Sequence, residues 1–170
     1  MPRRLTLRLT LVLVAFVAAG AGAGVVWEWL WVPPTGLVVE DTWYLDATGV
    51  RDDFSGTGVY VLVALVAGAL LGLAAGLTAR SHELATLGVV ALGSAAAAWV
   101  MVVTGTALGP PDPRPLAQGR EDYTALPSDL RVSGVAPYVA FPAGSLTVLA
   151  ACFLGLHRSP GSPPRGEPDR

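Results

Sequence analysis

Four long apolar stretches, almost free of charged residues, dominate the pattern of the chain. A helix needs about 20 apolar residues to cross a hydrocarbon core about 30 Å thick. The stretches over residues 9–31, 59–78, 84–108 and 137–156 meet this length. Pro142 lies inside the fourth stretch and is expected to bend it. The pattern therefore predicts an all-α fold, an integral membrane four-helix bundle.

Two polar loops, over residues about 32–58 and 109–136, lie on one side of the predicted spans. On the other side, only residues 79–83 separate the second and third spans, which predicts a tight antiparallel hairpin pinned by its turn. In the first loop, residues 37–39 and 43–45 are apolar and are compatible with a short β-hairpin. The pattern leaves open whether the two loops fold together.

The chain is interpreted as a single membrane domain over residues 1–158, followed by a tail over residues 159–170. The tail contains proline, small and charged residues, which is typical of a disordered segment. One alternative concerns the N-terminus: Arg3 and Arg4 precede an apolar run with small residues at 19–23, as in a cleaved signal peptide. The run continues to Trp31, which is long for such a peptide, and an uncleaved first span is the preferred interpretation.

The charges are distributed unequally between the two sides of the predicted membrane. The termini and the short turn together hold seven arginines and three acidic residues, whereas the two longer loops hold four arginines and nine acidic residues. Basic residues near the ends of spans favour the cytoplasmic side. The pattern predicts a plasma-membrane protein with both termini in the cytoplasm and two extracytoplasmic loops.

Composition narrows the range of functions. The chain is 52% hydrophobic and 14% charged, with a mean hydropathy of +0.54 and a formal net charge of -2. The expected surroundings are membrane lipid, and no global positive field is available to bind nucleic acid. Cys152 is the single cysteine, so an intramolecular disulfide is excluded.

Gly68, Gly72 and Gly76 recur every four residues in the second span. Such a strip lets two helices approach closely. Because the other spans carry similar spacings of small residues, packing within the bundle is the preferred interpretation, and a homo-oligomer interface is the alternative.

Glu28 is the one ionisable residue well within a predicted span. A carboxylate in a membrane is a candidate for proton or cation coupling. However, it lies about one turn from the outer end of the span, between Trp27 and Trp29, and tryptophan prefers the headgroup layer. The preferred interpretation is an interfacial carboxylate.

No catalytic, cofactor-binding or metal-binding constellation is found. His82, Glu83, Cys152 and His157 could ligate zinc by residue type but lack a ligand spacing. The acidic residues of the first outer loop show no calcium-loop spacing. The sequence contains no nucleophile elbow and no phosphate-binding glycine loop. We therefore predict no catalytic residues, metal or cofactor.

Several local motifs resemble those of an uncharacterised family of actinobacterial four-span membrane proteins, a domain of unknown function. They are Trp27-Glu28-Trp29-Leu30 before Pro33-Pro34, Asp53-Phe54 before the second span, Gly105 to Pro110, and Phe141-Pro142. The resemblance covers most of the chain and implies a plasma-membrane location in a high-GC Gram-positive cell. It implies no activity, ligand or active site.

Three functions are compatible with these observations. The first is a non-catalytic envelope scaffold or accessory subunit with a membrane-protein partner. The second is a small oligomeric transporter or channel subunit that uses Glu28. The third, a membrane-embedded enzyme, would require the outer acids and Arg114, Arg120 or Arg131 to converge on a cleft with Glu28.

Overall fold

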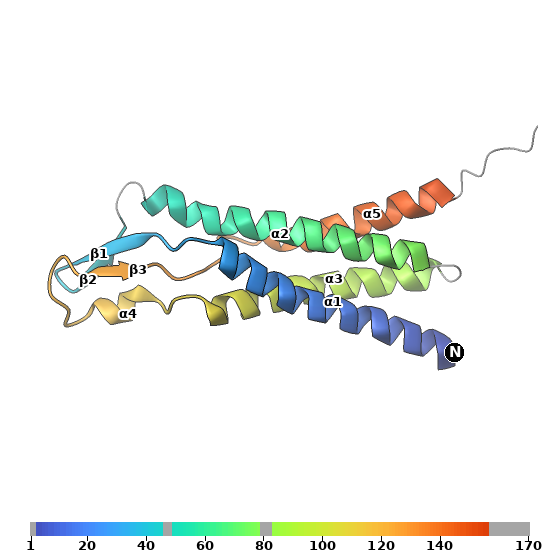
Figure 1. Cartoon of the computed structure of the whole chain (residues 1–170), viewed down its shortest axis with the longest axis horizontal. Coiled ribbons are helices and arrows are strands. Elements are labelled where there is room, and N and C mark those ends of the chain that lie inside the picture. The colour runs from blue at the N-terminus through green and yellow to red at the C-terminus, as the bar shows by residue number, and fades with distance from the viewer. Residues whose placement is uncertain (1–2, 46–48, 79–82, 157–170) are drawn as a thin grey trace, which may run out of the picture.

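The computed structural model describes residues 3–45, 49–78 and 83–156. Its long elements are α1 (Arg3–Leu30), α2 (Gly49–Thr78), α3 (Glu83–Leu108) and α5 (Ala140–Leu156), which Figure 1 shows side by side. All four are long and apolar enough to cross a membrane. By length and composition, four such helices match a multi-pass membrane protein. The tail over residues 159–170 lies outside the described residues.

The helices begin earlier or later than the apolar stretches alone indicate. α2 starts at Gly49 rather than near residue 59, and so extends beyond its candidate span, Ser55–Thr78. A 3-10 turn, η1 (Ala136–Val139), precedes α5. Pro142 lies in the first turn of α5, where a proline displaces no helical hydrogen bond, so it does not require a bend within the helix.

The four helices pack as two close pairs. α1 packs mainly against α3, and α2 packs mainly against α5. In Figure 1, α2 and α5 lie together above α1 and α3. Weaker contacts, between α3 and α5 and between α1 and α2, join the pairs into a ring. The members of each close pair run in the same direction, because each is separated from its partner by one returning helix.

Small residues bring α1 and α3 together. A Cβ atom added to Gly20 would lie 2.5 Å from the carbonyl oxygen of Ala97, and one added to Gly24 would lie 2.6 Å from that of Met101. At Gly105 of α3, an added Cβ would collide with the ring of Trp27. Neither interface helix can carry a side chain at these positions without moving apart.

The predicted glycine strip of α2 lies against α5. Added Cβ atoms at Gly68 and Gly72 would meet the main chain of Phe141 and Ser145, and one at Gly76 would lie 2.7 Å from Cβ of Cys152. In return, a Cβ at Gly144 of α5 would meet the main chain of α2. The strip thus packs within the chain.

The predicted tight hairpin of the second and third spans is not a packed pair in the structure. α2 and α3 run in opposite directions but make few contacts with each other, so they lie diagonally across the ring. The reason is the distribution of small residues, because each helix contacts most closely the partner that its glycines fit. The turn over residues 79–82 lies outside the described residues.

The fold is mostly helical, as predicted, but it also contains a small sheet. The outer loops contain β1 (Thr35–Val39), β2 (Thr42–Tyr44) and β3 (Ala125–Pro127), together with the short helix α4 (Pro113–Ala117). The three strands form an antiparallel sheet in the order β2-β1-β3. We call the sheet and α4 the cap; it lies at the end of the molecule away from the N-terminus (Figure 1).

We expect Gly72→Ala to destabilise the bundle by about 1–3 kcal/mol, because the added methyl group collides with the main chain of Ser145. Gly22→Ala is the matched control, since an added Cβ at this helical glycine meets nothing within 4 Å. The measurement is unfolding in mixed detergent micelles at increasing dodecyl sulfate. Equal stability of the two variants would show that the α2–α5 contact is less close than described.

Candidate functional site

The cap has a small core of its own between the sheet and α4. Val38 and Trp43 face α4, where they pack against buried Ala117. The indole of Trp43 lies over Gly36, at which an added Cβ would be 2.5 Å from the ring. Trp43 Nε1 then donates a hydrogen bond to the carbonyl oxygen of Leu126, at 3.1 Å. The side chain of Trp43 in β2 therefore reaches across β1 and forms a hydrogen bond with β3.

Two carboxylates fasten the first outer loop to the second. Asp122 accepts a hydrogen bond from the backbone N–H of Glu40, at 2.9 Å, and Asp41 accepts one from the backbone N–H of Gly119, also at 2.9 Å. Each of these bonds joins residues far apart in the sequence. The sequence left open whether the two loops fold together, and the structure joins them in one folded unit.

The turn between β1 and β2 has an unusual backbone. Val39 pairs with Thr42, so Glu40 and Asp41 form a two-residue hairpin loop, and both have positive φ, 48° and 60°. This is the requirement of a type I′ turn, which normally selects glycine or asparagine. The bonds to Asp122 and Gly119 hold these two residues in a conformation that their side chains disfavour.

The sheet face opposite α4 is uncovered, and we call it the open face. Its central row is apolar: Tyr44 pairs with Leu37, which pairs with Ala125. Leu37 is 43% exposed and Tyr44 is 56% exposed. The remaining outward-facing positions are Thr35, Val39, Thr42 and Pro127.

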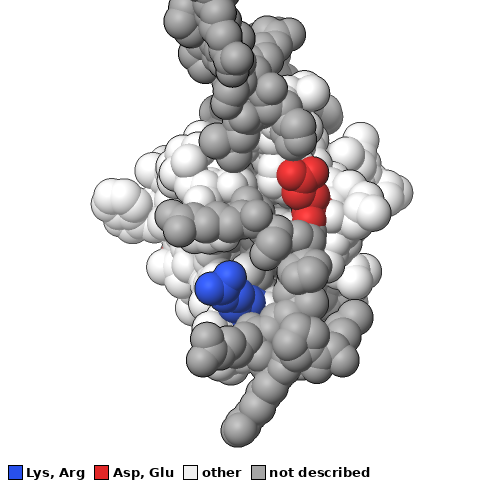
Figure 2. Space-filling view, turned by 90° about the vertical axis from the view of Figure 1, so that its right-hand side faces the viewer, with Lys and Arg blue, Asp and Glu red and all other residues white. Residues whose placement is uncertain are grey.

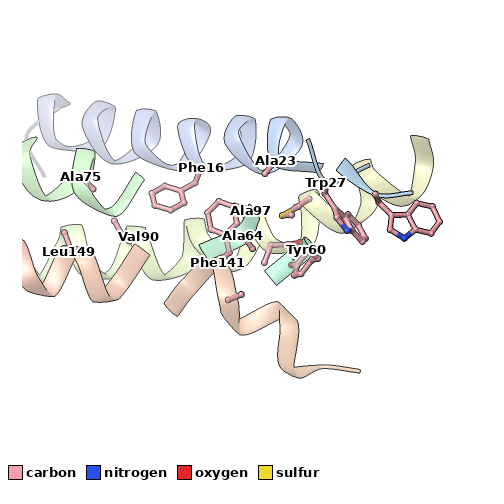
Figure 3. Close-up of a cluster of buried hydrophobic side chains, with 14 of the residues drawn as sticks. Phe16, Ala23, Trp27, Tyr60, Ala64, Ala75, Val90, Ala97, Phe141 and Leu149 are labelled. Carbon is pink, nitrogen blue, oxygen red and sulfur yellow. Dashed lines mark hydrogen bonds between the residues drawn. The ribbon is translucent and has the colours of Figure 1, made fainter. Parts of the chain in front are cut away.

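An aromatic cluster lies where the cap meets the helices; it is made of Trp27 of α1, Trp31 directly after α1, Tyr60 of α2 and Tyr138 of η1. The rings of Trp27 and Tyr60 meet edge to face with centroids 5.2 Å apart, and Tyr138 lies 6.1 Å from Tyr60. Figure 3 shows Trp27 and Tyr60 at one end of the buried core. The cluster closes this end of the bundle.

Two hydrogen bonds anchor the cluster to the main chains of other helices. Trp27 Nε1 donates to the carbonyl oxygen of Gly56, at 2.7 Å, and Tyr60 Oη donates to that of Ala98, at 3.3 Å. Trp31 differs, because its buried Nε1 has no hydrogen-bond partner. It lies against Gly56, where an added Cβ would be 3.1 Å away. Trp31 therefore contributes by packing alone.

The second outer loop is also fastened to the helices. Leu130 is buried in the main core and lies against Gly109, whose added Cβ would be 2.8 Å from Cβ of Leu130. The backbone N–H of Ser133 donates to Oγ1 of buried Thr57 in α2, at 3.0 Å. These contacts fix the cap's second loop to the helices.

Glu28, the carboxylate singled out in the sequence, lies in the last turn of α1 and is half-buried. Its neighbours in the sequence, Trp27 and Trp29, differ sharply, since the first is fully buried and the second is 78% exposed. Glu28 thus lies at the boundary between the packed and the exposed surfaces of the helix. The structure places it near the helix end, as the sequence indicated, and not midway along the span.

The remaining candidate groups do not form a cluster in the described part of the chain. No group of three or more histidine, cysteine, aspartate or glutamate residues in that part could hold a metal ion. Arg114 pairs with Asp112 at the exposed start of α4, at 3.9 Å. Cys152 packs beside Gly76, and Glu83 lies exposed at the start of α3. His82 and His157 lie outside the described residues.

The opposite end of the bundle carries little described charge. Figure 2 looks onto this end, where one basic group and one acidic group lie among uncharged atoms and grey atoms that are not described. The arginines that the sequence assigns to the cytoplasmic side, apart from Arg8, have side chains outside the described set.

Sequence reasoning missed the open face, the aromatic cluster and the third strand. A signal for the open face was present, because residues 35–39 read Thr-Gly-Leu-Val-Val without a charge. An antiparallel strand with one solvated face normally alternates with polar residues, which this stretch largely lacks. Strand β3 has only three residues and ends in proline, so nothing in its own sequence indicates pairing with β1.

Comparisons with known proteins assign neither a family nor a function to this chain. No protein family matches the chain, and neither a curated protein nor a solved structure is significantly similar to it. Inference about function rests on the residues and their geometry.

We expect Trp27→Phe to cost about 1 kcal/mol more stability than Trp31→Phe, because only Trp27 loses a hydrogen bond with its indole nitrogen. Both substitutions remove a similar part of a buried ring at the same end of α1. The measurement is the dodecyl sulfate midpoint of each purified variant. Equal midpoints would mean that the Trp27 bond to Gly56 adds nothing to the packing of the ring.

Proposed function

We propose that this chain is a non-catalytic accessory or scaffold subunit of a plasma-membrane assembly, and that the cap is the surface that contacts its partner. Both termini lie in the cytoplasm and the cap lies outside. The asymmetry of the charges in the sequence supports this orientation, because most arginines outside the spans lie with the termini.

The open face of the sheet is the observation that carries the proposal. A sheet with one solvated face normally alternates between apolar and polar positions. Here the outward positions of all three strands contain no charged residue, and Leu37 and Tyr44 are exposed at their centre. Exposed apolar surface of this kind is typical of protein contact sites.

The packing of the helices supports a structural role for this protein over a role in transport. The buried core of the described helices is made of aromatic, aliphatic and alanine side chains. The buried polar side chains there include Ser94 and Ser145, each of which donates to a carbonyl oxygen of its own helix. Such serines satisfy their own hydroxyl groups and offer no chain of polar groups across the bundle.

The test of the proposal is isolation of the chain from its native membrane in polymer-bounded lipid discs, followed by native mass measurement. We expect a complex with one other protein in a fixed ratio. Trp43→Ala, which removes the side chain that crosses the sheet, should release this protein, whereas Gly22→Ala should not. A chain that is free of other proteins in the discs would contradict the accessory role.

A transporter or channel subunit is the alternative function, with Glu28 as the coupling group. The half-burial of Glu28 at the end of α1 is the feature that favours it. If it is correct, Glu28→Gln should abolish proton or cation flux in reconstituted vesicles, since an amide cannot carry the charge. Flux that is absent from the wild type, or unchanged in the variant, would exclude this role for Glu28.

A further inference from the structure

The open face has the residue composition of a surface that is buried when the protein is bound to its partner. β1 is the central strand, and its outward positions Thr35, Leu37 and Val39 stand beside residues that are equally uncharged. An antiparallel sheet with one solvated face normally carries polar residues on that face. Here α4 covers one face, and the other carries no charged residue. The described residues leave that second face uncovered.

The charges at one end of the open face indicate which kind of side chain a partner would present there. The turn between β1 and β2 carries Glu40 and Asp41, and the adjoining loop carries Glu121 and Asp122. Arg120 is the single basic residue in this group of neighbouring positions. The end of the face is therefore acidic, and it favours a partner that presents lysine or arginine.

The acidic residues also argue against a second copy of this chain as the partner on the open face. Two copies in one membrane are related by an axis along the membrane normal, so their acidic turns lie at the same height on the same side. Sheets packed face to face would bring these turns toward each other, and like charges repel. The acidic end thus favours a different protein over self-association.

The orientation of the open face argues against contact with the bilayer surface. The strands continue roughly along the axis of the bundle, beyond the ends of the helices (Figure 1). Helices that cross a membrane fix that axis close to its normal. The open face consequently stands upright above the bilayer and does not lie flat against it.

We propose that the open face binds an extracytoplasmic segment of another envelope protein, with an apolar side chain seated on Leu37 and Tyr44 and basic residues beside the acidic turns. This inference rests on the proposed accessory role and adds the site and the chemistry of the partner. Glu40 and Glu121 are the groups that attract the basic residues. Asp41 and Asp122 are already engaged in holding the two loops together.

The experiment places a benzophenone amino acid at Leu37 in the full-length chain, in its native membrane, and identifies the cross-linked peptide by mass spectrometry. Leu116 is the matched control position, because it is 40% exposed on α4, at the other side of the cap. We expect the Leu37 probe to attach to one extracytoplasmic peptide with lysine or arginine near an apolar residue. The Leu116 probe should not attach to it.

Charge is tested with Glu40→Gln combined with Glu121→Gln. We expect this pair to lower the yield of the Leu37 adduct about fivefold, which is the effect of losing two exposed ion pairs. The substitutions leave the backbone hydrogen bonds of both residues possible, and unchanged amide hydrogen-exchange protection in strands β1 and β2 checks that the cap is folded. An unchanged yield with a folded cap would overturn the electrostatic part of the inference.

The outcomes separate this inference from the accessory role. If a partner is isolated in lipid discs but the Leu37 probe attaches instead to lipid, to a second copy or to nothing, the open face is not the binding site and the accessory role stands. If no partner is isolated and the Leu37 probe attaches to no protein, both fail. An adduct of equal yield from Leu116 would likewise overturn the assignment to the open face.

Discussion

Close approach of helix main chains is the constraint on which the remainder of this fold depends. In a lipid environment the hydrophobic effect does not drive helices together, so contact requires surfaces that fit at short range. The glycines of α1 and α2 supply such surfaces, and their partners are main-chain atoms of α3 and α5. Because a main-chain contact tolerates no added side chain, these glycines determine which helix lies beside which.

This constraint explains the order of the helices around the bundle. Consecutive helices with a short connection would normally pack as a hairpin, yet α2 and α3 lie on a diagonal. The aromatic residues then fill the space between the two close pairs, as where Phe16 of α1 meets Phe141 of α5 with ring centroids 6.3 Å apart. Phe16 and Phe141 thus meet between the pairs (Figure 3), whereas glycines line the closest main-chain contacts within each pair.

The sequence predicted the local features well and the relations between distant segments poorly. Apolar length identified four helices, and the apolar residues at 37–39 and 43–45 correctly indicated the β1–β2 hairpin. Strand β3 and the diagonal placement of α2 and α3 were missed, because both arise from contacts between segments far apart in the chain. For the site, Glu28 was found by its charge, whereas the open face became visible only when Leu37, Tyr44 and Ala125 were aligned across three strands.

The cap depends on the helix packing beneath it, and this dependence bears on what the cap can do. Its sheet combines β1 and β2 from the first outer loop with β3 from the second, and Leu130 and Ser133 fasten that second loop to the bundle. The positive φ angles of Glu40 and Asp41 are held by bonds from the same second loop. Because the open face takes strands from both outer loops, a partner that binds it would recognise the folded unit and not either loop alone.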